Sequence, residues 1–168
     1  MSHELHRSSS QPLVARCAII TLSDTRTEAT DASGRRIREL LESDGHQISF
    51  YQIIRDEPAE LEMLLLDLLA RQTIDVVLTN GGTGISRRDQ TIPLIQKHLT
   101  HMLPGFGELF RMLSWQQIGS AAMLSRAIAG IASGKPIFAM PGSTKAVELA
   151  MSKLILPELR HLLYELRK

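Results

Sequence analysis

The chain has 168 residues, of which 43% are hydrophobic and 22% are charged, and these proportions indicate a folded globular protein rather than a disordered chain. Its 19 Lys and Arg nearly balance 18 Asp and Glu, which argues against broad electrostatic binding of nucleic acid but leaves room for a local basic patch. The single cysteine, Cys17, excludes an internal disulfide framework and a cysteine-based metal cage.

The first twelve residues are polar and serine-rich, and this composition predicts a flexible N-terminal tail over residues 1–12. The tail contains His3 and His6, which could bind a metal, but its composition favours disorder. It lacks the hydrophobic core of an export signal, and the apolar runs elsewhere are too short to cross a bilayer. We therefore expect a cytoplasmic protein with no membrane partner and a single domain over residues 13–168.

The first predicted strand is Val14 to Leu22, which is apolar and rich in β-branched residues, as is typical of a buried parallel strand. Cys17 lies inside it, so we expect a buried and inert thiol rather than a nucleophile. After a polar loop, Gly34 to Asp44 places apolar residues at helical spacing. Ser33 is the predicted N-cap of this helix, and Gly45 is its predicted C-terminal stop.

A second predicted strand covers Gln47 to Ile54. Asp56-Glu57-Pro58 then opens a helix, because proline is tolerated in a first turn. Ile74 to Thr79 is the third strand, and it runs directly into a glycine-rich segment. The helix between these strands carries leucines whose spacing predicts core packing rather than a cofactor site, namely Leu61, Leu64, Leu65, Leu68 and Leu69.

The C-terminal half contains a further predicted strand, Pro136 to Met140, which follows a strand and turn around Ala127 to Lys135. Pro141 to Ser143 ends this strand and leads into the last helix, where Pro157 should cause a kink or a break. The other helices predicted in this half are Thr91 to about His98 and Gly105 to Trp115.

Alternating strands and helices predict an α/β fold, and we expect a three-layer sandwich whose central sheet is mainly parallel and is flanked by helices. In such sheets, ligands bind beyond the carboxyl ends of the strands. Four polar segments follow predicted strands, and we expect them to converge on one site: Ser23 to Thr25, Asp56 to Glu57, Asn80 to Asp89 and Pro141 to Ser143.

The strongest single motif is Asn80-Gly81-Gly82-Thr83-Gly84. Glycines allow positive φ angles, so successive backbone N–H groups could form an anion-binding nest, to which Thr83 would add a hydroxyl. A tight turn would need the same residues. The motif is not a Walker loop, because no Gly-Lys-Ser or Gly-Lys-Thr follows it, nor is it the dinucleotide fingerprint, which belongs after the first strand.

Asp89 lies five residues beyond Gly84, and a carboxylate next to a phosphate site calls for a cation between them. Mg²⁺ is the natural cation, because it takes one or two carboxylates together with phosphate oxygens. Asp56, at another strand end, could supply the second carboxylate. The structural alternatives are that Asp89 pairs with Arg87 or Arg88, or that each aspartate caps a helix.

Other polar residues near these motifs also have two interpretations. Asp24 could bind a ligand or act as a cap, and Ser143 could do the same at the last helix. Thr91 is most simply an N-cap. His98 and His101 are expected at the surface rather than as metal ligands, and no Ser–His–Asp or HExxH pattern is present.

A series of spaced motifs runs along the chain in the order TLSDTR, DxSG at Asp31 to Gly34, Asp56, TNGGTG with RRDQT, PGFGELFRMLSWQQIGS, LSRAIAG and FAMPGSTKA. In this order the motifs resemble the MoaB/MogA family of molybdenum cofactor biosynthesis proteins, and gephyrin carries a related domain. The likeness runs from about Ala15 to Leu159 and is closer to the MoaB branch. Ile92-Pro93-Leu94 departs from the Pro-Glu-Ala of many relatives, which should alter only a helix start.

The resemblance implies an enzyme that adenylylates molybdopterin with Mg-ATP and releases pyrophosphate, with Asp56 and Asp89 as catalytic and Mg²⁺-binding residues. It also implies a homo-oligomer, for which a hexamer is favoured over a trimer, and other molybdenum cofactor biosynthesis proteins as candidate partners. The residues assigned to binding the small-molecule substrates, molybdopterin and ATP, are Ser23, Asp24, Asn80, Gly81, Gly82, Thr83, Gly84, Pro141, Gly142 and Ser143.

Three alternatives accompany this interpretation. A non-catalytic protein of the MoaB branch would bind molybdopterin or act as a scaffold, although the presence of both aspartates favours activity. A nucleotide pyrophosphatase or deamidase similar to the CinA proteins would share the glycine loop, but those proteins usually carry acidic residues where this chain has Arg87 and Arg88. A general phosphate-binding or sugar-nucleotide-binding α/β domain would not explain the ordered motifs.

Overall fold

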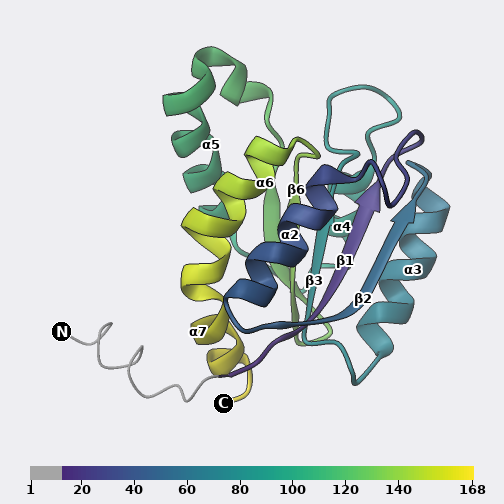
Figure 1. Ribbon diagram of the computed structural model, residues 1–168, viewed down its shortest axis with the longest axis vertical. Helices are drawn as coiled ribbons and strands as arrows, with labels where there is room; N and C mark the ends of the chain where they lie inside the picture. The colour runs from purple at the N-terminus through teal and green to yellow at the C-terminus, as the bar shows by residue number, and fades with distance from the viewer. Residues whose placement is uncertain (1–12) are drawn as a thin grey trace.

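A six-stranded sheet forms the centre of the computed structural model, which describes residues 13–168 (Figure 1). The strands lie in the order β2-β1-β3-β6-β5-β4. Strands β1, β2, β3 and β6 run parallel, and β5 runs antiparallel to both of its neighbours. The mainly parallel α/β sheet predicted from the sequence is confirmed. The tail predicted for residues 1–12 lies outside the described residues.

The elements follow one another as β1 (Arg16–Leu22), α2 (Ala32–Ser43), β2 (Gln47–Ile54), α3 (Pro58–Ala70), β3 (Val76–Asn80), α4 (Thr91–His98), β4 (His101–Met102), α5 (Pro104–Ile118), η1 (Gly119–Leu124), β5 (Ile128–Ala132), β6 (Lys135–Met140), α6 (Thr144–Ala150), η2 (Met151–Ile155) and α7 (Leu156–Leu166). The short strand β4 was not predicted from the sequence. None of the helices in the described chain is long and apolar enough to span a membrane.

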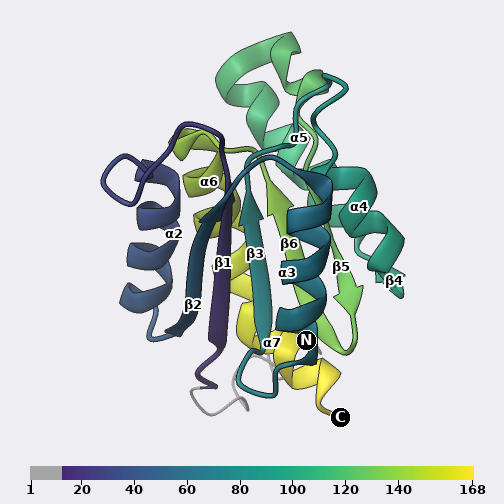
Figure 2. The same cartoon turned by 90° about the vertical axis from the view of Figure 1, so that its right-hand side faces the viewer.

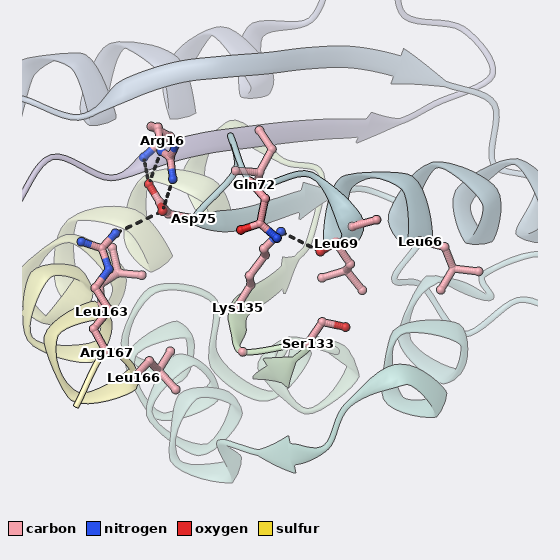
Figure 3. A pocket seen from close by; sticks show the side chains of 13 residues that line it. Arg16, Leu66, Leu69, Gln72, Asp75, Ser133, Lys135, Leu163, Leu166 and Arg167 are labelled. Atoms are coloured by element: carbon pink, nitrogen blue, oxygen red, sulfur yellow. Dashed lines mark hydrogen bonds and ion pairs between the residues drawn. The ribbon is translucent and has the colours of Figure 1, made fainter.

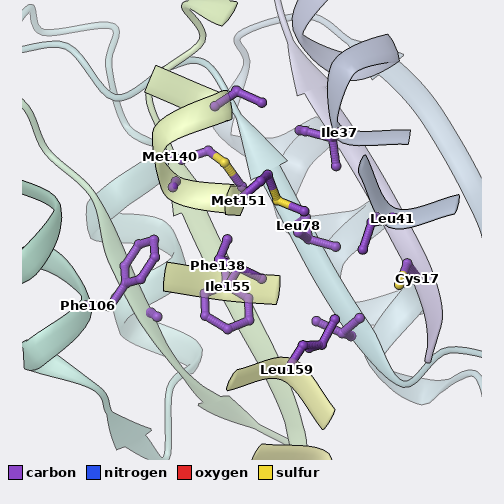
Figure 4. Close-up of a cluster of buried hydrophobic side chains, with 14 of the residues drawn as sticks. Cys17, Ile37, Leu41, Leu78, Phe106, Phe138, Met140, Met151, Ile155 and Leu159 are labelled. Carbon is purple, nitrogen blue, oxygen red and sulfur yellow. The ribbon is translucent and has the colours of Figure 1, made fainter. Parts of the chain in front are cut away.

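Two hydrophobic cores lie on the two faces of the sheet, because successive residues of a strand point to opposite sides. Cys17 and Ile19 of β1 join a core with α2, α5, α6 and α7, part of which Figure 4 shows. Ala18 and Ile20 join a second core with α3 and α4. Figure 2 shows α3 across the strands and α2 on the far side. The three-layer sandwich is therefore confirmed.

Cys17 is fully buried in the first core, and burial raises the pKa of its thiol to about 12. A thiol that stays protonated at neutral pH is a poor nucleophile. The structure therefore confirms the prediction of a buried and inert Cys17.

Three predicted helix caps are wrong by one or two positions. Asp31, not Ser33, caps α2, because its carboxylate accepts the backbone N–H of Gly34 at 3.0 Å. Glu57 occupies the N-cap position of α3 and makes no capping bond, which leaves Asp56 outside the helix. Thr91 is the first residue of α4, not its cap. The side chains of Ser33, Asp56 and Thr91 therefore do not cap helices and are available for other contacts.

The last helix differs from the prediction in how it accommodates Pro157. The chain does not break there but forms a π-helical turn, η2, directly before α7, and Pro157 lies in the first turn of α7. A wider turn relieves the clash between a proline ring and the carbonyl of the preceding turn. Ser143 does cap α6, as one of its two interpretations predicted, since its Oγ accepts the backbone N–H of Ala146.

Candidate functional site

The loops that follow β1, β2, β3 and β6 leave the sheet at the same edge, as the parallel order requires. The backbone N–H of Ser23 donates to Ile54 at 2.9 Å, and that of Gly81 donates to Met140 at 3.1 Å. Helix α2 follows β1 on one face, and α4 follows β3 on the other. The strands β1 and β3 therefore flank a switch point of the sheet, where α/β proteins bind ligands.

The glycine motif packs against the other loops at this edge. Gly81 has a φ of +99°, and a Cβ on it would lie 2.2 Å from the carbonyl oxygen of Leu22. Gly82 has a φ of +61°, and a Cβ on it would meet the Thr91 hydroxyl at 2.2 Å and the Asp56 carboxylate at 2.6 Å. Glycine is required here both for conformation and for space. The loop is therefore more than a tight turn, because it brings backbone close to a carboxylate.

The two predicted functional aspartates, Asp56 and Asp89, lie beside this loop in different surroundings. Asp89 accepts the backbone N–H of Ser86 at 2.8 Å as well as its hydroxyl, and the hydrogen bond from the Ser86 side chain lowers the pKa of Asp89. The carboxylate of Asp56 meets no hydrogen-bond donor in the described chain. Partial burial, and then the charges of Asp89 and Asp24, raise the pKa of Asp56. The site therefore holds one satisfied and one unsatisfied carboxylate.

Asp24 connects the loop after β1 to this pair. Its Oδ1 accepts the backbone N–H of Asp56 at 3.2 Å, and its Oδ2 forms an ion pair with Arg88 at 2.8 Å. Arg88 also lies 3.9 Å from Glu57. The suggested pairing of Asp89 with an adjacent arginine is therefore not what the structure shows, because Arg88 turns toward Asp24 instead.

Arg126, just before β5, holds the glycine loop and was missed by the sequence analysis. Its guanidinium donates to the carbonyl oxygens of Thr83, Gly84 and Asp89. These bonds fix the carbonyls on one side of the loop. The only sequence signal for this role was the LSRAIAG motif, which contains Arg126.

A polar network lies beneath the site and contains Arg26, which the sequence analysis missed, and Asn80, which it placed among the binding residues. Arg26 donates to the Gly142 carbonyl at 2.7 Å and to the Ser33 hydroxyl. Asn80 is fully buried, and its amide donates to Thr21 at 2.8 Å while its oxygen accepts the Ser33 hydroxyl at 3.0 Å. The Asn80 side chain thus supports the site from below and does not line it.

Asp31 anchors this network as a buried carboxylate. Burial acts to raise its pKa, but hydrogen bonds from Thr21, the Gly34 backbone, Tyr51 and Ser33 outweigh burial and lower the pKa. A buried carboxylate with several donors is a rigid structural anchor. The DxSG motif therefore has a structural role that spacing alone did not indicate.

Two cavities lie at this edge of the sheet, lined by the loops after β1 and β6. One of about 880 Å³ lies beside Pro141 and Ser143 and is lined by α5 and α6, with Lys145 and Lys153 at its wall. The other, of about 430 Å³, is lined by Ser23 and Asp24 and by residues of β2. Both volumes are within the range of small-molecule sites. Of the predicted ligand-binding residues, Ser23 and Asp24 line the smaller cavity and Pro141 and Ser143 line the larger one, whereas the residues of the glycine loop line neither.

The residues at this edge fit a magnesium ion that is shared with phosphates. No group of three or more His, Cys, Asp or Glu side chains within residues 13–168 is arranged to hold a metal by itself. The unpaired carboxylate of Asp56 lies close enough to Asp89 and Asp24 for their charges to raise its pKa. Mg²⁺ in nucleotide sites is held by one or two carboxylates plus phosphate oxygens, which agrees with this set.

Another cavity, of about 490 Å³, lies at the amino end of the sheet, and Figure 3 shows Arg16 and Arg167 in contact with Asp75. Arg16 donates to both carboxylate oxygens of Asp75 at 2.8 Å, and Arg167 lies 3.1 Å away from it. Lys135 donates to the carbonyl oxygens of Leu69 and Arg71 at the end of α3. Because each of these charged groups already has a hydrogen-bond partner, the cavity is less suited to bind a charged ligand.

Comparisons with known proteins agree with one another. Residues 18–161 match the family described as "Probable molybdopterin binding domain". Molybdenum cofactor biosynthesis protein B of Halalkalibacterium halodurans is 53% identical over 100% of this chain and 99% of that protein, and that of Bacillus subtilis is 48% identical over the same shares.

Comparison with solved structures also finds cofactor biosynthesis proteins of this kind. A crystal structure of molybdenum cofactor biosynthesis protein B has a TM-score of 0.91 at 51% identity and covers 94% of this chain and 98% of that one. The tungsten cofactor synthesizing protein MoaB from Pyrococcus furiosus has a TM-score of 0.83 at 36% identity, over 94% and 100% of the two chains. CinA from Thermoplasma acidophilum, at 16% identity and a TM-score of 0.58, shares the fold.

Proposed function

Since the chain belongs to the MoaB/MogA family of molybdenum cofactor biosynthesis proteins, on its MoaB branch, we propose that it binds molybdopterin and adenylylates it with Mg-ATP. The observation that carries the proposal is the unsatisfied Asp56 carboxylate next to Asp89 at the glycine loop. A carboxylate without a donor, next to a second acid and to backbone amides, is expected where a divalent cation and phosphates bind together.

In this proposal the two substrates occupy different parts of the edge. The larger cavity, beside Ser143 and Lys145, would receive molybdopterin, since it combines apolar walls with a lysine that can pair with a phosphate. The glycine loop, with Asp56 and Asp89, would hold the triphosphate of ATP. In this arrangement the two phosphate groups meet at the loop between β3 and α4.

The proposed reaction forms a bond between the terminal phosphate of molybdopterin and the α-phosphorus of ATP, while the bond to pyrophosphate breaks. The attacking phosphate has a second pKa near 6 and is therefore mostly a dianion at neutral pH. No protein base has to remove a proton. The task of the protein is to bring two anions together in line, so positioning and charge neutralisation supply the catalysis.

Each group of residues has a defined part in that task. The amides of Gly82 and Thr83 would donate to phosphate oxygens, since that of Gly81 donates to Met140 and that of Gly84 to Asp89, and Arg126 fixes the loop by holding its carbonyls. Asp56 and Asp89 would hold Mg²⁺, which when bound neutralises phosphate charge. Ser143 and Lys145 would orient the pterin-side phosphate. Arg26 keeps the loop after β6 next to β1 and β3 through Gly142.

The test is pyrophosphate release from ATP and molybdopterin by the purified protein and by Asp56→Asn and Asp89→Asn. We expect each variant to lose at least about 100-fold in turnover, as removal of a key electrostatic group typically costs, and to keep molybdopterin binding. Asp75→Asn, the same change at the other end of the sheet, is the control and should retain turnover. Full turnover by Asp89→Asn would contradict the metal assignment. Molybdopterin binding without turnover by the unaltered protein would instead indicate a non-catalytic carrier.

We also propose that the chain forms a homo-oligomer, with a hexamer favoured. Helix α5 and η1 expose large apolar side chains, including Trp115 at 61% and Met123 at 77%. A monomer rarely exposes several such side chains on neighbouring turns. Light scattering coupled to size exclusion should give the mass of a trimer or a hexamer, and Trp115→Glu should lower it. A monomeric mass at micromolar concentration would contradict the proposal.

A further inference from the structure

The hydroxyl of Thr91 is an unexplained polar group in the described structure. Thr91 is only 1% exposed, and its Oγ1 has no hydrogen-bond partner. A buried hydroxyl without a partner costs stability, because its hydrogen bonds to water are lost and not replaced. A valine has almost the same shape and carries no such cost. The threonine at this position therefore calls for an explanation beyond packing.

The surroundings of this hydroxyl point to the Asp56 carboxylate. Both Thr91 Oγ1 and Asp56 Oδ1 face the Cα of Gly82, at 2.2 Å and 2.6 Å from the position where a Cβ would lie. The carboxylate also lacks a donor in the described chain. An O–H group that lacks an acceptor and a carboxylate that lacks a donor thus occupy the same small space, which exists because residue 82 is glycine.

We propose that Thr91 is a positioning residue for Asp56, and that its hydroxyl donates to one carboxylate oxygen when the other turns toward a bound divalent cation. This inference rests on the proposed function, since it assigns Asp56 to a metal–nucleotide site. Thr91 cannot touch the ligand itself, because its hydroxyl is covered. Groups that orient metal-binding carboxylates through such hydrogen bonds typically change metal affinity 10- to 100-fold.

The position of Thr91 suits this role. It is the first residue of α4, and its backbone N–H donates to the Gly82 carbonyl at 3.3 Å. The hydroxyl is thus fixed to the same loop that holds the phosphates. A shift of the loop on ligand binding would carry Thr91 and Gly82 together, which keeps the hydroxyl next to the carboxylate.

The experiment separates affinity from stability. Mn²⁺ binding is measured in the presence of ATP by electron paramagnetic resonance, because Mn²⁺ also prefers oxygen ligands and is spectroscopically visible. The thermal midpoint of each variant is measured without ligand. We expect Thr91→Val to bind Mn²⁺ about tenfold more weakly while its thermal midpoint is unchanged or higher. Thr91→Ser, which keeps the hydroxyl, should stay within about twofold of the unaltered protein in Mn²⁺ affinity.

Thr79 provides a matched control, because its hydroxyl is also buried and lacks a partner but lies within strand β3. Thr79→Val should keep Mn²⁺ affinity. If the unaltered protein binds Mn²⁺ with ATP and Thr91→Val binds it equally well, the inference is overturned and the proposed function stands. If the unaltered protein binds no Mn²⁺ with ATP, both are overturned. A Thr91→Val protein that loses affinity only together with its thermal stability would show a structural role and overturn the inference.

Discussion

At the amino end of the sheet, Asp75 accepts hydrogen bonds from Arg16 and Arg167, whereas at the carboxyl end Asp56 meets other carboxylates and no donor in the described chain. Both ends contain a cavity and several charged residues. At the amino end each charged group has a partner, and the bonds of Asp75 connect β1 to the residue just after α7. At the carboxyl end the Asp56 carboxylate has no donor among the described residues, although Arg88 and Arg126 offset part of the negative charge around it.

Charged residues are present at both ends, so it is their state of pairing that distinguishes the proposed ligand site from the other end. Paired charges at partly exposed positions contribute to the stability of the fold. An unpaired carboxylate costs stability, and it is compensated when a cation or donor arrives with a ligand. The same distinction applies to glycines with positive φ, since Gly134 turns in open space while Gly82 makes room for Asp56 and Thr91.

The largest expected effect comes from Gly82→Ala. The new Cβ would adopt a left-handed conformation and would also collide with Thr91 and Asp56, so we expect a loss of about 1–3 kcal/mol in the free energy of unfolding and loss of nucleotide binding. Gly134→Ala has the same conformational strain and no atom within 4 Å. It should cost about 1 kcal/mol and keep binding. Urea unfolding measures the stability of the two variants, and ATP titration measures their nucleotide binding. Equal ATP binding by the two variants would contradict the distinction between Gly82 and Gly134.

The second effect tests the amino end. Asp75→Asn leaves two guanidinium groups without a carboxylate, and we expect it to lower the free energy of unfolding by about 1–2 kcal/mol, since the partners are partly exposed. Affinity for ATP should not change. Urea unfolding at neutral pH is the measurement. An Asp75→Asn protein of unaltered stability that binds ATP poorly would show that the cavity at the amino end, not the carboxyl edge of the sheet, carries the ligand site.

The third effect is a pH dependence of the free energy of unfolding, which arises from a histidine at the amino end. His46 is buried and accepts the backbone N–H of Ala15, and burial lowers its pKa in the folded protein. The unfolded chain, with a histidine pKa of about 6.5, therefore takes up a proton that the folded protein does not. The free energy of unfolding therefore has its full value above about pH 6.5 and decreases as the pH falls below it.

His46→Gln should flatten this decrease in the free energy of unfolding between about pH 6.5 and 5, where one proton accounts for up to about 1.4 kcal/mol per pH unit. His101→Gln, at an exposed position, is the control and should leave the slope as it is. An identical pH dependence for His46→Gln and the unaltered protein would exclude His46 as the source.

The smallest effect is expected for Arg88→Ala. Its ion pair with Asp24 is exposed on both sides, at 67% and 41% of the side chains, so removal should change the free energy of unfolding by less than about 0.5 kcal/mol. Arg16→Ala, at the amino end, should cost more because Asp75 is largely buried. Urea unfolding of the two variants side by side decides this, and a larger loss for Arg88→Ala would reverse the ranking of the two ends.

Much of the fold followed from local patterns. The strand at Gln47–Ile54 and the helix at Thr91–His98 have the predicted bounds, because hydrophobic periodicity depends on neighbouring residues alone. The edge at which the four polar loops meet also followed, because parallel strands align their carboxyl ends. The caps were less predictable, since Asp31 and Ser33 are both good cap residues and only packing selects between them.

The sequence by itself determined the α/β architecture, the order of the motifs and the glycine loop beside two aspartates. Tertiary structure decided which of these groups have partners. Arg26 reaches Gly142 across 116 residues, and Arg126 reaches the glycine loop across about 40, distances at which no periodicity carries information. The unsatisfied state of Asp56 and the solitary hydroxyl of Thr91 depend on what packing leaves without a partner, and that property exists only in the folded chain.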